Sequence, residues 1–201
     1  MARPREFDAD AALGAALNVF WKQGFEGASL TDLTRAMGIT RPSLYAAFGN
    51  KETLFRKALD RYYDMSMGFV GPALAEPTLR RAIENLLYGY ADAFTANAHP
   101  AGCLATNGAL VCSQAAEPVR LELVARRDAE EAALRARLAK AHADGDLPPG
   151  LDVGALSSYL MAIVQGMSVQ AASGATRDAL YAIVATTLRA GLFGGTDAAG
   201  N

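Results

Sequence analysis

The sequence predicts an all-α protein, and three observations support this fold class. Apolar residues recur every three or four positions along almost the whole chain, which is the spacing of one face of an α-helix. Runs of β-branched residues, which favour strands, are absent. Hydrophobic residues make up 51% of the 201 residues and charged residues only 20%, so the chain has enough apolar surface to fold around a core.

The N-terminal part of the chain predicts a series of short helices with recognisable ends. Asp8 can cap a first helix, and Gly24 can close it. A second helix begins after Ser29, because the segment Ser-Leu-Thr-Asp offers a capping box, and it stops at Gly38. Thr40 then caps a third helix.

The connection between the second and third helices has the spacing of a helix-turn-helix. Gly38 permits the tight turn, and Ile39 fills the gap between the two helices. Pro42 falls in the first turn of the third helix, where its missing N–H costs little. Asn50 can cap a fourth helix that begins at Lys51.

The distribution of charge favours a nucleic-acid partner for this motif alone. The formal net charge of the chain is −2, which excludes the bulk basic excess of many nucleic-acid-binding proteins. Between residues 33 and 57, however, five basic residues stand against one acidic residue, a local excess of +4. Such an excess attracts a phosphate backbone despite the negative charge of the whole chain.

The remainder of the chain predicts a larger helical body. Glycine and proline residues between 68 and 77 punctuate a connector, and the residues from 145 to 150 predict a loop. The segment 118–142 carries interleaved charges of both signs, typical of a solvated helix face with ion pairs four residues apart. The helices expected in this body cover residues 79–94, 104–111, 118–142, 152–172 and 176–192.

Four segments around the helix-turn-helix match the pattern of one protein family. They are Ser29-Leu30-Thr31-Asp32-Leu33, Gly38-Ile39-Thr40-Arg41-Pro42-Ser43-Leu44-Tyr45, Phe48-Gly49-Asn50-Lys51-Glu52 and Leu54-Phe55. In these residues the chain resembles the DNA-binding domain of the TetR family of one-component bacterial transcriptional regulators. Two positions depart from the family pattern, namely Thr34 and Ala47.

The resemblance implies an N-terminal three-helix DNA-binding domain, residues 1–50, joined by a fourth helix to a larger helical ligand-binding and dimerisation domain, residues 51–201. The third helix is then expected to enter the major groove of double-stranded operator DNA. Arg3 and Arg5, on an arm before the first helix, could add further contacts. Bases are expected to contact Arg41, Pro42 and Ser43, and phosphates to contact Thr31, Thr40, Tyr45 and Lys51.

The resemblance also implies a homodimer formed by the last two helices. The sequence supports this independently, because both helices are apolar on more than one face and need partners beyond their own domain. A small-molecule inducer is expected in the C-terminal domain, where amphipathic or polar residues interrupt apolar segments; the alternative is an ordinary packed core. The ligand-binding residues predicted in this way are Tyr88, Phe94, Cys103, Asn107, Met161 and Gln165.

The sequence favours a cytoplasmic location. The first residues form no apolar segment, so secretion is not expected, and two cysteines, Cys103 and Cys112, are too few for a disulfide framework. The uncharged run 153–176 is long enough to span a membrane, but serine and glutamine residues interrupt it, which favours a buried helix. Cys103 is expected to be a small buried residue, and a redox role for it is left open.

These observations predict a ligand-responsive transcriptional regulator, in the first place a repressor, that binds a palindromic operator as a homodimer and is released by an inducer. An activator would differ only in the sign of regulation. The alternative from another class is a helical enzyme or small-molecule carrier without specific DNA binding. No catalytic motif or metal-ligand spacing is found in the sequence, so neither enzymatic activity nor a cofactor or metal is expected.

Overall fold

The computed structural model describes residues 7–109 and 116–190, with only the backbone of 107–109. Within these ranges all the regular elements are helices, as the sequence predicts. They are α1 (Ala9–Gly27), α2 (Leu30–Met37), α3 (Arg41–Phe48), α4 (Lys51–Ser66), α5 (Val70–Leu74), α6 (Leu79–Thr95), α7 (Leu104–Ala109), α8 (Glu117–Ala143), α9 (Val153–Ala172) and α10 (Arg177–Arg189).

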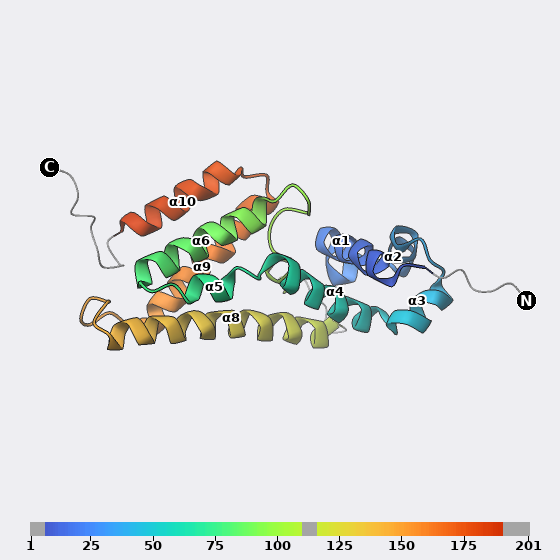
Figure 1. Ribbon diagram of the computed structural model, residues 1–201. Coiled ribbons are helices and arrows are strands. Elements are labelled where there is room, and N and C mark those ends of the chain that lie inside the picture. The colour runs from blue at the N-terminus through green and yellow to red at the C-terminus, as the bar shows by residue number, and fades with distance from the viewer. Residues whose placement is uncertain (1–6, 110–115, 191–201) are drawn as a thin grey trace, which may run out of the picture.

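The helices form a small head and a larger body at opposite ends of an elongated molecule (Figure 1). The head consists of α1, α2 and α3, and α1 packs against both α2 and α4. The body consists of α5 to α10, in which α6 packs against α9 and α10, and α8 packs against α9. Because α4 runs from the head into the body, it is the one helix in the described residues that belongs to both (Figure 1).

The start of each head helix is fixed by the cap that the sequence predicts. The carboxylate of Asp8 accepts hydrogen bonds from two backbone N–H groups of the first turn of α1, at 2.9 and 3.1 Å. Ser29 and Asp32 form a reciprocal capping box at the start of α2. Gly38 ends α2 in the left-handed conformation with φ of 66°, which a residue without Cβ adopts at little cost.

An aromatic cluster joins the head to α4. The rings of Phe20 and Phe55 meet edge to face, with centroids 5.1 Å apart, and Phe25 contacts Phe55 in the same way at 5.3 Å. Leu33 and Leu44, from α2 and α3, are fully buried in the same hydrophobic core. The orientation of the head is therefore coupled to α4 by close packing rather than by a flexible link.

Two sequence predictions need correction. Gly24 does not close the first helix: its φ of 70° introduces a kink, and one more turn follows before α1 ends at Gly27. The connector between 68 and 77 contains a short helix, α5, because Pro72 lies in its first turn, where no backbone donor is needed. Residues 110, 111, 191 and 192, which complete two predicted helices, lie outside the described residues.

The uncharged segment 153–176 forms α9, a buried helix of the body, together with the turn that follows it. Its interrupting serines have partners inside the protein: Ser168 Oγ accepts the backbone N–H of Cys103 at 2.8 Å. Ser157 Oγ lies 3.4 Å from the carbonyl oxygen of Glu131. Among the described helices, none combines the length and the apolar character that a bilayer crossing requires.

Candidate nucleic-acid interface and ligand site

One face of α3 packs on the rest of the head, and the opposite face is exposed to solvent. Leu44 and Phe48 are buried, whereas Arg41, Pro42 and Tyr45 are exposed. Half of the surface of Tyr45 remains accessible, a large exposure for an aromatic residue. The exposed face thus offers a guanidinium, a proline ring and a phenol side by side, which are groups that contact base edges and phosphates.

The two hydroxyl groups at the start of α3 are bonded to each other. Thr40 accepts the backbone N–H of Ser43 at 3.3 Å, and the two side-chain oxygens lie 3.0 Å apart. Thr40 is exposed and Ser43 is partly buried. Because one of the two hydroxyl hydrogens is used between them, the pair keeps one hydrogen that can be donated to a phosphate.

Arg41 and Thr31, which the sequence assigned to separate roles, are in contact. The Nη2 group of Arg41 donates a hydrogen bond to Oγ1 of Thr31 at 2.9 Å, across the turn between α2 and α3. Both residues are exposed. The base-reading and phosphate-binding groups predicted on two different helices therefore form one connected surface.

Lys51, at the first position of α4, lies against the head rather than extending freely into solvent. Its Nζ is 4.6 Å from the centroid of the Phe25 ring, a cation–π arrangement. Partial burial lowers the pKa of Lys51, while the charge of Glu26 acts in the opposite direction. The ammonium group is thus held at a defined place beside α3, as a phosphate ligand needs to be.

A group of polar side chains lies inside the body, where α4, α6 and α8 meet. It is called the polar cluster here and consists of Tyr62, Tyr63, Tyr90, Cys103 and Glu130. The hydroxyl of Tyr90 donates to Oε2 of Glu130 at 3.4 Å, and the rings of Tyr62 and Tyr63 are 5.4 Å apart. The hydroxyls of Tyr62 and Tyr63 are buried without a partner at ordinary hydrogen-bond distance, which is costly in a protein interior.

Burial dominates the ionisation of the polar cluster. It raises the pKa of Glu130, although the phenols of Tyr63 and Tyr90 favour the ionised carboxylate. It also raises the pKa of the Cys103 thiol, so this cysteine is a buried neutral group, in agreement with the sequence prediction. A thiol of this kind is a poor nucleophile at neutral pH.

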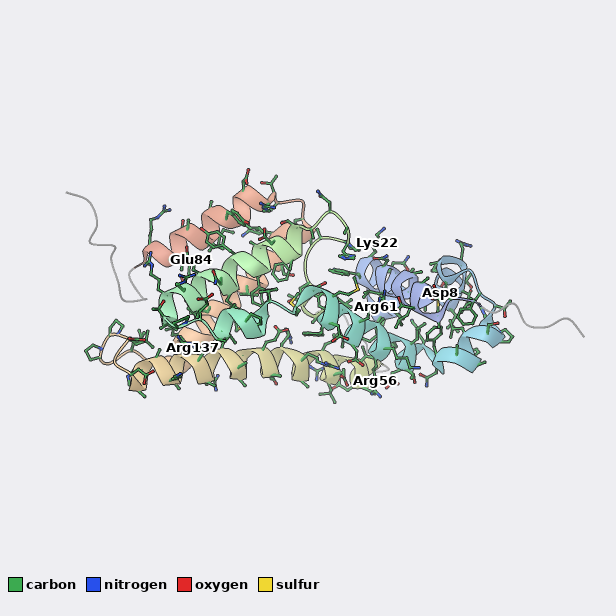
Figure 2. The ribbon with its side chains drawn as sticks, in the orientation of Figure 1. Asp8, Lys22, Arg56, Arg61, Glu84 and Arg137 are labelled. Atoms are coloured by element: carbon green, nitrogen blue, oxygen red, sulfur yellow. The ribbon has the colours of Figure 1, made fainter. Side chains whose placement is uncertain are left out.

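The polar cluster is connected to the head through α4. Glu122, Arg126 and Glu130 are spaced four residues apart on one face of α8; the first two pair with residues of α4, and Glu130 is bonded to Tyr90 of α6. Arg126 forms an ion pair with Asp60 and lies 5.3 Å from the centroid of the Tyr63 ring. Nearer the head, Arg56 of α4 is 3.9 Å from Glu122, on the side of α4 that faces α8 (Figure 2).

The six predicted ligand residues do not form one site. Cys103 belongs to the polar cluster, and the Phe94 ring packs on the ring of Tyr90 with centroids 5.5 Å apart. Tyr88 points elsewhere, because its ring meets the edge of Tyr181 on α10 at 4.8 Å. Of the other three, Met161 is buried in α9, Gln165 is partly buried on the same helix, and the side chain of Asn107 lies outside the described residues.

Sequence reasoning missed most of the polar cluster. Tyr62, Tyr63 and Tyr90 occupy inward positions of amphipathic helices, where an aromatic residue is ordinarily read as core. Glu130 lies in a helix that the sequence describes as solvated, and that description holds for exposed pairs such as Arg135 with Glu131 at 2.9 Å. The sequence does contain one indication of the cluster: Glu130 falls at the helical spacing of the buried apolar residues of α8, such as Leu123 and Leu134.

Two hollows lie away from the polar cluster. A cavity of about 470 Å³ separates α1 from the segment before α7 and is lined by Trp21, Gly24, Pro100 and Leu104, among others. A groove of about 420 Å³ runs between α9 and α10, with Tyr159, Ile163, Ile183 and Thr186 in its walls. Among the described residues, no group of three or more histidine, cysteine or acidic side chains could hold a metal ion.

Comparison with known proteins places both parts of the chain in one family. Residues 12–58 match the bacterial regulatory proteins of the tetR family, and residues 78–189 match the tetracyclin repressor-like C-terminal domain. The HTH-type transcriptional repressor ComR of Escherichia coli (strain K12) is 39% identical over 189 residues, which cover 93% of this chain and 90% of ComR.

Solved structures agree with this assignment. A cysteine-substituted variant of the TetR family regulator CifR, in complex with a 26-base-pair operator DNA, superimposes with a TM-score of 0.88 at 41% identity, covering 94% of this chain and 99% of CifR. A TetR regulator from Rhodococcus sp. RHA1 is 44% identical, with a TM-score of 0.63, and the match covers 93% of this chain and all of that protein.

Proposed function

The chain belongs to the TetR family of bacterial transcriptional regulators, and we propose that it is a repressor that binds palindromic double-stranded DNA as a homodimer and is released by a small-molecule inducer. The exposed face of α3, with Arg41 and Tyr45 at the end of the head, is the observation that carries the DNA-binding part. CifR, similar over almost the whole chain, is bound to operator DNA in its solved structure.

In the proposed complex, α3 enters the major groove and the residues around it hold the backbone. Arg41, Pro42 and Ser43 face the bases at the start of the helix. The phosphate ligands are Tyr45 and Lys51, together with the hydroxyls of Thr31 and Thr40. The local positive charge draws the head to DNA, whereas the body, which carries most of the acidic residues, adds no attraction.

The proposed dimer uses α9 and α10. Tyr159 and Val169 of α9 are exposed to 42% and 46%, and the groove between the two helices has apolar walls. Large apolar side chains on an open helix face mark a protein interface. Pairing these helices with their copies gives a four-helix bundle with twofold symmetry, and it places two heads on half-sites about 34 Å apart.

The polar cluster supports the proposed response to an inducer. The hydroxyls of Tyr62 and Tyr63, which lack a partner at ordinary hydrogen-bond distance, can be satisfied by a polar ligand, and the aromatic rings of Phe94 and Tyr90 supply an apolar wall. A ligand that binds more tightly to the DNA-incompetent state shifts the population towards that state. The cluster contacts α4, which also packs on the head, so we place the transmission of the signal in this helix.

We further propose three features that the sequence predicts. They are a cytoplasmic location, where bacterial operators lie, a boundary between the two domains near residue 50, and inducer contacts from Cys103 and Phe94, with Tyr88, Asn107, Met161 and Gln165 as further candidates. The response requires no metal or cofactor.

Selection of DNA by the purified protein tests the function. A library of randomised duplexes is incubated with the full chain at about 0.1 M salt, where surface charges are screened over roughly 10 Å. The expected result is enrichment of an inverted repeat, to which two protomers bind. Failure to enrich any sequence above the starting library would contradict the proposal and favour a small-molecule carrier or enzyme.

A further inference from the structure

The contact between Thr31 and Arg41 assigns a role to Thr31 beyond that of a phosphate ligand. Arg41 occupies the first position of α3, where its long side chain would otherwise sample many rotamers. Its Nη2 is 2.9 Å from the Thr31 oxygen, which lies ten residues earlier in the chain. The bond therefore fixes the direction of the guanidinium relative to the head.

The acceptor is itself held in place by the start of α2. The Ser29 side chain accepts the N–H of Asp32 at 3.0 Å, and the Asp32 carboxylate accepts from the backbone N–H and the hydroxyl of Ser29 at 3.3 and 2.5 Å. Thr31 lies within this closed first turn. Its hydroxyl thus forms a fixed point for Arg41 rather than a mobile surface group.

The charge of Arg41 remains available. Among the described residues, Arg41 has no ion pair with a carboxylate, and the neighbouring Asp32 is engaged by Ser29, whose hydroxyl lowers the pKa of Asp32. Thr31 is a neutral acceptor that takes only one of the five N–H donors of the guanidinium. The remaining donors can form the two parallel bonds by which arginine reads O6 and N7 of guanine.

We propose that Thr31 is a positioning residue: it orients Arg41 so that the guanidinium reads a guanine in each half-site, and it determines specificity from α2 without contacting a base. This inference rests on the proposed function of the head as a DNA reader. It differs from a phosphate contact in one measurable respect. A lost phosphate contact weakens binding to every duplex alike, whereas a lost positioning bond weakens binding only where Arg41 reads its base.

The test compares two substitutions of similar size. Thr31→Val removes the hydroxyl and keeps the branched shape, and Thr31→Ser keeps the hydroxyl as the matched control. Affinities are measured for the duplex selected by the wild-type protein and for a scrambled duplex of equal length. We expect Thr31→Val to weaken binding to the selected duplex about fivefold more than binding to the scrambled duplex, the effect of one lost hydrogen bond, because a lost phosphate contact lowers both affinities alike and leaves their ratio unchanged. Thr31→Ser should retain the wild-type ratio of the two affinities.

The same substitutions are then made in an Arg41→Ala background. If Thr31 acts through Arg41, Thr31→Val does not change the ratio of the two affinities any further there, and selection with the Thr31→Val protein relaxes the same base position that Arg41→Ala relaxes. Equal weakening on both duplexes, or an effect of Thr31→Val on the affinity ratio that is as large without Arg41 as with it, would overturn the inference. If the wild-type protein selects no sequence at all, the proposed function fails instead, so the two failures are distinguishable.

Discussion

The exposed surface of the head and the polar cluster of the body contain similar side chains in opposite environments, one open to solvent and the other in the protein interior. In the head, the tyrosine, threonine and arginine side chains around α3 are exposed to solvent, and the bonds that Arg41 and Thr40 form to Thr31 and Ser43 leave donors for a partner. In the body, Tyr62 and Tyr90 are buried, Tyr63 and Glu130 are partly buried, and the hydroxyls of Tyr62 and Tyr63 lack a partner at ordinary hydrogen-bond distance. The head can therefore bind a charged polymer without rearrangement, whereas the cluster gains stability when a ligand forms hydrogen bonds with its polar groups.

Removal of Arg41, the proposed base-reading residue, should have the largest effect on the DNA-binding side of this comparison. Arg41→Ala is expected to weaken binding to the selected duplex about tenfold or more, because a bidentate contact to guanine contributes roughly 1–3 kcal/mol of discrimination. Fluorescence anisotropy with selected and scrambled duplexes measures the change. Lys22→Ala serves as the control, since Lys22 is an exposed cation at the body end of α1, away from α3 (Figure 2). Equal losses for the two variants would refute base reading by Arg41.

A smaller loss of DNA affinity is expected when Lys51, the proposed phosphate ligand, is replaced. Lys51→Ala should weaken binding to selected and scrambled duplexes alike, by a few-fold, because a backbone contact carries no sequence information. The decisive quantity is the slope of log affinity against log salt concentration, which should become shallower by about 0.9 per protomer for one lost phosphate contact. A slope identical to that of the wild-type protein would remove Lys51 from the interface.

The head could be predicted from the sequence because its features are local. Each cap lies within three residues of the donor it satisfies, as with Asn50, whose side chain accepts the N–H of Thr53 at 2.8 Å. The exposed face of α3 follows from the positions of Leu44 and Phe48 alone. What the sequence could not show is the bond from Arg41 to Thr31, which depends on the angle between two helices.

The polar cluster could not be predicted because it depends on contacts between residues far apart in the chain. Tyr90 and Glu130 are separated by 40 positions, and helical periodicity cannot tell a tyrosine that packs in a core from one that faces a buried carboxylate. Of the six residues proposed as ligand contacts, Cys103 and Phe94 lie in or beside the cluster, while Tyr88 belongs to the contact between α6 and α10.

The pH dependence of stability tests whether Glu130 is buried in the polar cluster. Burial raises its pKa above the ordinary value of 4.5, so the folded state binds this proton more tightly than the unfolded chain. The resulting stabilisation is present below pH 4.5 and is lost as the pH rises through the raised pKa. Glu130→Gln should therefore gain thermal stability relative to the wild-type protein as the pH rises from acidic to neutral, measured as the difference in melting temperature across this range.

The control for this titration is Glu131→Gln, four residues from Arg135 on the same helix and engaged in a surface ion pair. Glu130→Gln should gain melting temperature over this control as the pH rises, because Glu130 lies among the tyrosines of the polar cluster whereas Glu131 is paired with Arg135. If both variants follow the same pH profile, Glu130 is not in a buried environment.

The smallest expected effect concerns the ion pair between α4 and α8. Asp60→Ala removes one of the two carboxylate partners of Arg126 and leaves Glu122, and because the groups are partly solvated, we expect a loss of at most about 1 kcal/mol of unfolding free energy in denaturant titration. DNA affinity without inducer should remain within twofold of the wild-type value. A large loss of stability would mean that this contact, rather than the apolar core, holds α8 against α4.

The most direct test of the proposed function is a hydroxyl-radical footprint on the selected duplex, combined with the mass of the complex by sedimentation. The account predicts two protected segments related by a dyad and centred about 34 Å apart, with two protomers or a multiple of two on each duplex. The Arg41→Ala protein should lose both segments together. A single protected segment occupied by one protomer, or protection spread evenly over the duplex, would contradict a dimeric regulator that reads its operator through α3.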